Sequence, residues 1–315
     1  MLVLDATQTR AALPWDGLVK ALGDMFAKGC VMPVRHHHDV EVPGEADATL
    51  LLMPAWQPGA YIGVKMVSVF PGNQMRGLPA IHGSYLLSSG KTGEMLAIVD
   101  GGELTARRTA AASALAARYL AREDASRMLM AGTGRLSANV IEAHASVRPI
   151  RNVTIWGRDP KKAEATAREL SLKDISVAVA TDLETAAREA DVISCATLSS
   201  EPLIRGDWLK PGAHLDLIGA FKPSMRESDD RAAQLSSIFV DTREGALSEG
   251  GDIVQPIRSG VITRDAIRAD LFELTRGTHP GRTKPDEITL FKSVGAALED
   301  LAGAVLAFET YRTKA

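Results

Sequence analysis

Hydrophobic and polar positions follow one pattern in the first hundred residues and a different pattern further along the chain. Apolar runs separated by short turn signals occupy residues 50–53, 61–70, 80–88 and 94–99. Closely spaced strands with short turns predict an antiparallel sheet. An alanine-rich helix is predicted to follow this sheet, over roughly 103–121.

From about Ser126 the pattern becomes one of strands that alternate with helices. Strands are predicted at residues 128–131, 153–156, 175–179, 191–196, 214–218 and 238–240. Such units imply a parallel sheet with helices on both faces. The last segment, 290–308, is predicted as a helix that can pack back on the first domain. The fold class is therefore α/β, with a doubly wound parallel sheet at 121–289 and a β-rich α+β domain at 1–120, to which the terminal segment at 290–315 can belong.

Composition and charge exclude several classes of protein. The chain has 315 residues, which suits two domains, and its net charge of −3 favours neither nucleic acid nor a membrane surface as a partner. It contains no run of about 18 uncharged apolar residues, so we expect no membrane span. Asp5 lies in the only early apolar run, which predicts a strand instead of a signal peptide. Cys30 and Cys195 lie far apart, and we expect free thiols in a reducing cytoplasm.

The strongest local motif is Gly132-Thr133-Gly134-Arg135-Leu136-Ser137, which follows a predicted strand and opens a predicted helix. Gly132 permits a tight turn, and Gly134 lacks a Cβ, so the backbone can approach a pyrophosphate. The helix N-terminus offers free N–H groups and a partial positive charge. Ser137 replaces the third glycine of the fingerprint and is still small. The motif predicts a dinucleotide site, and a plain turn is the alternative.

The end of the next predicted strand indicates which dinucleotide binds. A site specific for NAD usually places a carboxylate there, on the ribose 2′-hydroxyl. Here Gly157 takes that position and Arg158 follows, and a guanidinium suits a 2′-phosphate. We therefore expect NADPH, with NADH as the alternative, because Asp159 can neutralise Arg158 or approach a ribose itself.

Two basic residues lie in apolar surroundings. Lys65 is the only charged residue from Tyr61 to Phe70, and it is either an anion-binding or proton-donating lysine or a lysine that reaches solvent from a strand edge. Arg108 falls in the apolar stripe of the predicted helix, so its guanidinium needs a phosphate, a substrate carboxylate or a distant Asp or Glu. Its neighbour Arg107 shares a face with Glu103 and is expected to be solvated.

Other basic residues give weaker signals. Arg35 follows Met32-Pro33-Val34 and indicates little by itself. The run His36-His37-His38 does not predict a metal site, because three consecutive side chains do not converge in a strand. His82 lies in an apolar strand and is either a core histidine or one next to a ligand.

At these residues the chain resembles the ornithine cyclodeaminase/μ-crystallin family. The matching segments are Gly63-Val64-Lys65, Asp100-Gly101-Gly102, Leu104 to Ala111, Gly132-Thr133-Gly134, Glu201-Pro202-Leu203 through Trp208 to His214, and Phe291-Lys292-Ser293-Val294-Gly295. They span nearly the whole chain and are specific in combination. The resemblance implies a homodimer, with a Rossmann-type domain and a substrate-binding, dimerising domain built from both chain ends.

The resemblance also implies roles for individual residues. Arg35, Lys65 and Arg108 would hold a substrate carboxylate. The residues expected to line the dinucleotide are Thr109, Gly132, Thr133, Gly134, Arg135, Leu136, Arg158, Thr197 and Ser293. No metal is expected.

One departure from the family pattern bears on the reaction. Family cyclodeaminases carry an aspartate just after a Gly-Gly pair, and here the stretch Ile218-Gly219-Ala220-Phe221 places Phe221 at that position. An apolar ring cannot accept a proton or orient an ammonium group, so the chain is similar to the reductase branch of the family. The substrates implied are Δ1-pyrroline-2-carboxylate and Δ1-piperideine-2-carboxylate, which give L-proline and L-pipecolate. An alanine-type dehydrogenase, a cyclodeaminase and a non-catalytic NADPH-binding protein are the alternatives.

The mechanism expected for a reductase is mostly one of positioning. The docked carboxylate fixes C2 of the substrate beside the nicotinamide, and Phe221 packs against the aliphatic ring. The ring nitrogen must carry a proton when the hydride arrives. Lys65, His82 or solvent can supply that proton, and the sequence does not choose among them.

Overall fold

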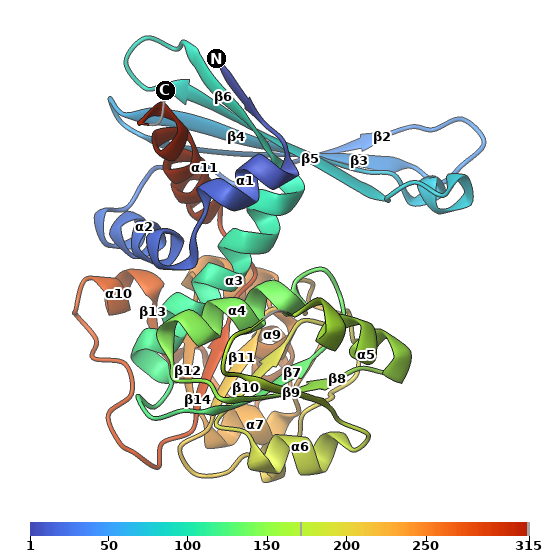
Figure 1. Cartoon of the computed structure of the whole chain (residues 1–315), viewed down its shortest axis with the longest axis vertical. Coiled ribbons are helices and arrows are strands. Elements are labelled where there is room, and N and C mark those ends of the chain that lie inside the picture. The colour runs from blue at the N-terminus through green and yellow to red at the C-terminus, as the bar shows by residue number, and fades with distance from the viewer. Residues whose placement is uncertain (171, 314–315) are drawn as a thin grey trace. The chain divides into compact units, whose positions relative to one another are not determined.

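The computed structural model describes residues 1–170 and 172–313, and the chain divides into two compact units (Figure 1). The first unit contains residues 1–108 and the chain from Ala297 onward, and the second runs from Thr109 to Ala296. A domain built from both chain ends was predicted, with boundaries after residues 120 and 289. Residues 314 and 315 of that predicted domain, and residue 171 of the other, lie outside the described residues.

The first unit contains a six-stranded sheet. Its strands are β1 (Leu2–Leu4), β2 (His36–Val40), β3 (Ala48–Gln57), β4 (Tyr61–Val69), β5 (Ile81–Ser89) and β6 (Met95–Asp100). Their order is β1-β6-β5-β4-β3-β2, and β2 to β6 pair antiparallel as predicted, whereas β1 pairs parallel with β6. The β4 strand is therefore central, between β3 and β5.

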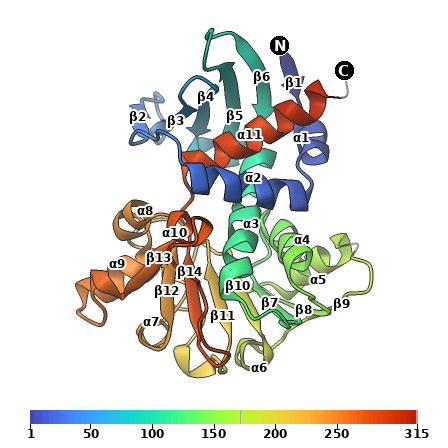
Figure 2. The same ribbon diagram turned by 90° about the vertical axis from the view of Figure 1, so that its left-hand side faces the viewer.

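Helices cover one face of this sheet. They are α1 (Ala6–Ala12), α2 (Trp15–Lys28), the start of α3 (Gly101–Leu120), and α11 (Ala297–Arg312). The α11 helix packs against β3 to β6 and against α2, as Figure 2 shows. The helices α1 and α2 were not predicted from the sequence. Leu18, Leu22 and Phe26 of α2 are fully buried, because the helix turns its apolar side toward the rest of the unit.

The second unit contains eight strands that all pair parallel. They are β7 (Arg127–Ala131), β8 (Asn152–Trp156), β9 (Ser176–Val179), β10 (Val192–Cys195), β11 (His214–Leu217), β12 (Ser237–Val240), β13 (Ile267–Asp270) and β14 (Thr289–Lys292). Their order is β13-β12-β14-β11-β10-β7-β8-β9. The strand order reverses between β7 and β10, which is the switch point of a doubly wound sheet. The predicted fold class is confirmed.

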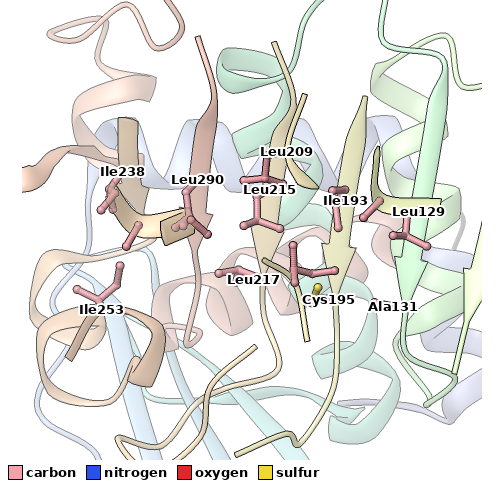
Figure 3. Close-up of a cluster of buried hydrophobic side chains, with 14 of the residues drawn as sticks. Leu129, Ala131, Ile193, Cys195, Leu209, Leu215, Leu217, Ile238, Ile253 and Leu290 are labelled. Atoms are coloured by element: carbon pink, nitrogen blue, oxygen red, sulfur yellow. The ribbon is translucent and has the colours of Figure 1, made fainter. Parts of the chain in front are cut away.

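Alternate residues of these strands form the core of the second unit (Figure 3). Leu129, Ile193 and Leu215 lie on one face of the sheet, within a cluster that includes Cys195 and residues of the helices on that face. The helices of the unit are α4 (Ser137–Val147), α5 (Pro160–Glu169), α6 (Leu183–Glu189), α7 (Asp230–Leu235), α8 (Arg243–Ser248), α9 (Gly251–Arg258) and α10 (Leu271–Thr275). Across the described residues, no helix combines the length and the apolar character that a membrane span requires.

One predicted element was wrong in its first residues. The segment from 290 was expected to be helical, but Thr289–Lys292 forms β14, which lies between β11 and β12 in the middle of the sheet. The helix begins only at Ala297. The apolar spacing of Phe291, Val294 and Leu298 matches a helix by coincidence, because a short buried strand has no periodicity of its own to contradict it.

Candidate functional site

A cavity of about 580 Å³ opens where β7, β8 and β10 end. Its lining residues are Gly132, Thr133, Gly134, Trp156, Gly157, Arg158, Asp159, Lys162, Ala196, Thr197, Leu198, Ser199 and Leu203. The cavity lies at the switch point, where loops leave neighbouring strands in opposite directions and a crevice results. This is the place where open parallel sheets bind dinucleotides.

The loop after β7 has the geometry that the fingerprint requires. Gly132 has a φ of 131°, and a Cβ at this position would lie 2.8 Å from the carbonyl oxygen of Ala196, so only glycine fits. The Ser137 hydroxyl donates a hydrogen bond to the Gly132 carbonyl over 3.0 Å and closes the loop. A Cβ on Gly134 would meet no protein atom within 4 Å, so this part of the loop faces open space.

The start of α4 completes an anion site. Its N-cap residue, Leu136, makes no side-chain hydrogen bond to the helix. The first-turn N–H groups therefore lack a side-chain cap, and they carry the positive end of the helix dipole. A pyrophosphate on the open side of Gly134 fits these donors, so the residues present suit a nicotinamide dinucleotide.

Two cations lie at the rim of the cavity. Arg158 is exposed, and Lys162 of α5 lines the cavity beside it. The Asp159 side chain accepts a hydrogen bond from the Lys161 backbone N–H, over 3.0 Å, and so caps α5. The carboxylate of Asp159 is thus used by the helix, which weakens its expected competition with Arg158. Lys162, in the first turn of α5, was not among the predicted cofactor residues.

The predicted cofactor residues separate into three groups. Gly132, Thr133, Gly134, Arg158 and Thr197 line the cavity, and Arg135 and Leu136 follow directly at the start of α4. Thr109 and Ser293 are outside the lining set. Thr109 is buried in α3, and the Ser293 hydroxyl donates to the Asp241 carboxylate over 2.9 Å.

A second group of predicted site residues lies inside the first unit. Lys65 projects from β4 onto the covered face of the sheet, where its ammonium lies 2.7 Å from Asp300 of α11. Arg108 donates to the same carboxylate through Nε (3.0 Å) and to Glu299 through an Nη (2.7 Å). All four side chains are buried, so two cations and two anions form one neutral cluster, which we call the Lys65–Asp300 cluster.

Burial and charge act in opposite directions in this cluster. Burial lowers the pKa of Lys65 to about 8, although Asp300 acts against this shift. Burial also disfavours the charged form of Arg108, but Asp300 and Glu299 outweigh it and raise the pKa of Arg108. Burial disfavours the Asp300 carboxylate in turn, yet Arg108 and Lys65 outweigh it and keep the pKa of Asp300 below its usual value. Lys65 is thus the member of the cluster that is closest to losing its proton near neutral pH.

The cluster revises the expectations for three basic residues. Arg108 does point inward, but its partners are internal carboxylates, which is the alternative to a substrate carboxylate. Lys65 lies on a central strand and not at a sheet edge. Arg107 was expected to be solvated, and this was wrong: it is 5% exposed, donates to the Leu13 carbonyl over 2.9 and 2.7 Å, and stacks 3.8 Å above the ring of Trp15.

His82 is not brought together with Lys65. In the β4–β5 register Lys65 is opposite Tyr85, whereas His82 is opposite Ser68. Opposite residues share a face and successive residues alternate, so His82 projects from the open face of the sheet and Lys65 from the covered face. His82 is exposed, which makes the expectation of a core histidine wrong.

The remaining predicted residues lie in different units. Arg35 is half-buried and lies just before β2, in the first unit. Phe221 is 42% exposed and lies just beyond the carboxyl end of β11, in the second unit. The three histidines at 36–38 form β2, and the described residues contain no group of three or more potential metal ligands.

Comparisons with known proteins agree with this arrangement. The model of the ornithine cyclodeaminase/mu-crystallin family matches residues 16–315. A Δ1-pyrroline-2-carboxylate reductase from Paracoccus denitrificans is 39% identical, over 92% of this chain and 90% of its own.

Two solved structures are similar over the whole chain. The Δ1-pyrroline-2-carboxylate reductase of Thermococcus litoralis, in complex with NADH and L-proline, has a TM-score of 0.91 and 33% identity, with 100% of this chain and 98% of that chain covered. An archaeal alanine dehydrogenase dimer with bound NAD has a TM-score of 0.89 and 31% identity, with 100% and 97% covered.

Proposed function

Because the chain belongs to the ornithine cyclodeaminase/mu-crystallin family, we propose that it is a ketimine reductase that uses a nicotinamide cofactor. The proposed substrates are Δ1-pyrroline-2-carboxylate and Δ1-piperideine-2-carboxylate, and the products are L-proline and L-pipecolate. The observation that carries this proposal is the likeness, over nearly the whole chain, to a reductase structure that holds NADH and L-proline. Since the alanine dehydrogenase structure is almost as similar, alanine oxidation is the second candidate.

The chemistry at the end of β11 supports reduction over cyclodeamination. Phe221 is exposed enough to contact a bound molecule, and its ring has no proton to exchange. A lyase that releases ammonia from a diamine needs an acid or base at the substrate nitrogen. An apolar ring at this position instead suits contact with the methylene groups of a cyclic substrate.

The proposed reaction adds a hydride to C2 and a proton to the ring nitrogen, so that the C=N bond becomes a C–N single bond. The cofactor supplies the hydride when it is bound. We assign the proton to Lys65, because its ammonium has three N–H donors, of which Asp300 accepts one, and its pKa is about 8. Its other donors can bind the substrate carboxylate, together with Arg35. Arg108 then acts indirectly, by holding Asp300 in place.

We propose NADPH as the preferred cofactor. Arg158 and Lys162 place two positive charges at the rim of the dinucleotide cavity, and Asp159 is used in capping α5. A 2′-phosphate carries negative charge and several acceptors, so it gains more from this pair than a 2′-hydroxyl does.

We also propose a homodimer that forms through the open face of the first unit's sheet. Ile62 and Met66 of β4 project from this face and are 40% and 39% exposed. Val64 lies between them on β4, and Leu86 of the neighbouring β5 is paired with Val64. An apolar sheet face of this kind is a surface that soluble proteins normally cover. The likeness to an alanine dehydrogenase that is a dimer supports a second copy as the cover.

A substrate panel tests the proposed reaction. Purified protein is mixed with NADPH or NADH and with Δ1-pyrroline-2-carboxylate, Δ1-piperideine-2-carboxylate, or pyruvate plus ammonia, and consumption of the reduced cofactor is followed by absorbance. L-alanine and L-ornithine are tested with the oxidised cofactor. We expect the highest kcat/KM with a cyclic ketimine. Faster alanine oxidation, or ammonia release from ornithine without net cofactor turnover, would refute the proposal.

A further inference from the structure

We infer that Glu227 is a positioning residue for cofactor binding. Its buried carboxylate joins two segments of the second unit: the wall of the dinucleotide cavity at 197–203, and the turn at 219–221 that carries Phe221. The inference rests on the proposed binding of a nicotinamide dinucleotide in that cavity. It adds a residue that does not line the cavity itself.

The carboxylate of Glu227 accepts hydrogen bonds from both segments. One oxygen accepts from the backbone N–H and the hydroxyl of Thr197, each over 2.7 Å. The other oxygen accepts from the backbone N–H of Gly219 over 2.8 Å and of Ala220 over 3.3 Å. Thr197 lines the cavity, and Ala220 directly precedes Phe221. One side chain therefore positions the loop that follows β10 and the loop that follows β11.

The two strands are neighbours, which brings these loops together. Cys195 of β10 is paired with Leu217 of β11, and Figure 3 shows both side by side. Thr197 and Gly219 each lie two residues after this pair, and a Cβ on Gly219 would lie only 2.0 Å from the Thr197 carbonyl oxygen. The backbones are in direct contact there, so a shift at 219 moves Thr197 as well.

The backbone around Glu227 is attached to the same wall. Its carbonyl oxygen accepts from the N–H groups of Leu203 and Ile204, over 2.9 and 3.0 Å. The Arg226 N–H donates to the carbonyl of Ser199 over 2.8 Å. Leu203 and Ser199 both line the cavity. The segment 226–227 thus contacts the wall at Thr197, Ser199 and Leu203.

A buried ion pair between Asp252 and Lys292 contacts the backbone of Glu227. Asp252 of α9 accepts from the backbone N–H of Glu227 over 2.8 Å, and its other oxygen lies 3.2 Å from the Lys292 ammonium of β14. All three side chains are 0% exposed. The charged groups that face Glu227 are Lys292 and Asp252, and the Cys195 thiol of β10 lies close enough to be affected by it. Burial raises the pKa of Glu227 to about 7, and Lys292 limits that rise.

A carboxylate is needed here because both oxygens accept. An amide has one acceptor oxygen and one NH2 group. In Glu227→Gln the NH2 group would therefore face another donor, the N–H of either Thr197 or Gly219, with no acceptor between them. One loop must then move. The fold has no comparable need for the cavity wall to lie at one exact position, whereas a bound dinucleotide does.

The test compares Glu227→Gln with Asp216→Asn in the full-length protein. Asp216 is an equally buried carboxylate on β11, but it accepts from the hydroxyls of Ser113 and Ser194, which are outside the cavity. Binding of NADPH and NADH is titrated by fluorescence, and Tm is measured for each variant. We expect Glu227→Gln to raise the cofactor Kd roughly 10- to 100-fold, and Asp216→Asn to lower Tm while Kd stays within about twofold.

Further readouts keep the test decisive. Wild-type Kd should rise as the pH falls below about 7, where Glu227 takes up a proton, and this dependence should be lost in Glu227→Gln. If that variant does not fold, Glu227→Asp keeps the carboxylate on a side chain one methylene shorter, so it cannot reach both loops, and it should still weaken binding several-fold. Unchanged cofactor Kd in the folded Glu227→Gln variant, or equal weakening in Asp216→Asn, would overturn the inference alone. A wild-type protein that binds neither dinucleotide would overturn the proposed function as well.

Discussion

The Lys65 ammonium lies 2.7 Å from the Asp300 carboxylate, and both side chains are buried. With Arg108 and Glu299 the cluster has no net charge. A free cationic pocket would attract any anion, but a neutral cluster binds a substrate carboxylate only through donors that Asp300 leaves unused. The substrate binding that we propose at Lys65 is then selective for an acid that fits beside it, because the cluster as a whole offers no general attraction to anions.

The rate of reduction should depend on the protonation of Lys65. Because its pKa is about 8, kcat/KM for a cyclic ketimine should fall as the pH rises above about 8. Lys65→Arg should remove this limb and lower kcat strongly, since a guanidinium keeps its proton and cannot donate it, and Lys65→Met should abolish turnover. A pH profile of kcat/KM for the three proteins makes the measurement.

The same pKa gives a stability control for that profile. The ordinary pKa of lysine, 10.5, is higher than the value of about 8 in the folded protein. The unfolded chain therefore binds more protons between these values, and the contribution of Lys65 to the free energy of unfolding rises with pH in this window. Loss of activity with loss of fold above about pH 8 would contradict the assignment to Lys65.

The two acids of the cluster should differ in their effects. Asp300→Asn leaves Lys65 and Arg108 as two buried like charges, so we expect a loss of about 3–5 kcal/mol in the free energy of unfolding. The alkaline limb of kcat/KM should move to lower pH, because the carboxylate that favours the Lys65 ammonium is gone. Glu299→Gln is the matched control, since Glu299 accepts from Arg108 over 2.7 Å and raises the pKa of Lys65 less than Asp300 does. An equal shift of the limb in both variants would contradict a specific role for Asp300.

Cofactor choice should depend on the rim of the dinucleotide cavity. Arg158→Ala and Lys162→Ala should each raise the Kd of NADPH by about 10-fold or more and change the Kd of NADH little, because only NADPH has a 2′-phosphate. The control is Asp159→Asn, which keeps a side-chain oxygen to cap α5 and should leave the ratio of the two constants nearly unchanged. Equal losses for both cofactors in Arg158→Ala would contradict the proposal.

The apolar open face of the first sheet should mediate dimerisation. Met66→Asp places a charge at the centre of this face. Light scattering after size exclusion should therefore show a dimer for the wild-type protein and a monomer for the variant. Leu235→Asp is the control, because Leu235 has similar exposure, 37%, and belongs to the other unit. Monomeric wild-type protein, or a dimer that survives Met66→Asp, would disprove this interface.

Much of the fold was accessible from the sequence because local patterns determine it. The alternation of strands and helices predicted the parallel sheet, and the glycine motif located the cavity at its switch point. The two early helices, α1 and α2, were not predicted, because the strong apolar runs lie after residue 50 and the pattern of Leu18, Leu22 and Phe26 is shorter.

The functional site was less accessible, because its partners are distant in the chain. The sequence indicated that Arg108 needed a carboxylate, but not that Glu299 and Asp300 would supply it. A signal existed: these are the only charged residues from 297 to 308, in the part of α11 that is otherwise apolar or uncharged. Glu227 gave no comparable signal, since it lies in a polar stretch and its role depends on three loops that meet only in the folded sheet.

The place of β14 has a consequence for how the chain is made. This strand is the last of the second unit in sequence, yet it lies between β11 and β12. Until residue 292 has left the ribosome, both neighbouring strands have an open edge that can pair with another chain. A protein shortened before β14 should therefore aggregate during synthesis, and the cell must keep the nascent chain apart from its copies until the sheet can be completed.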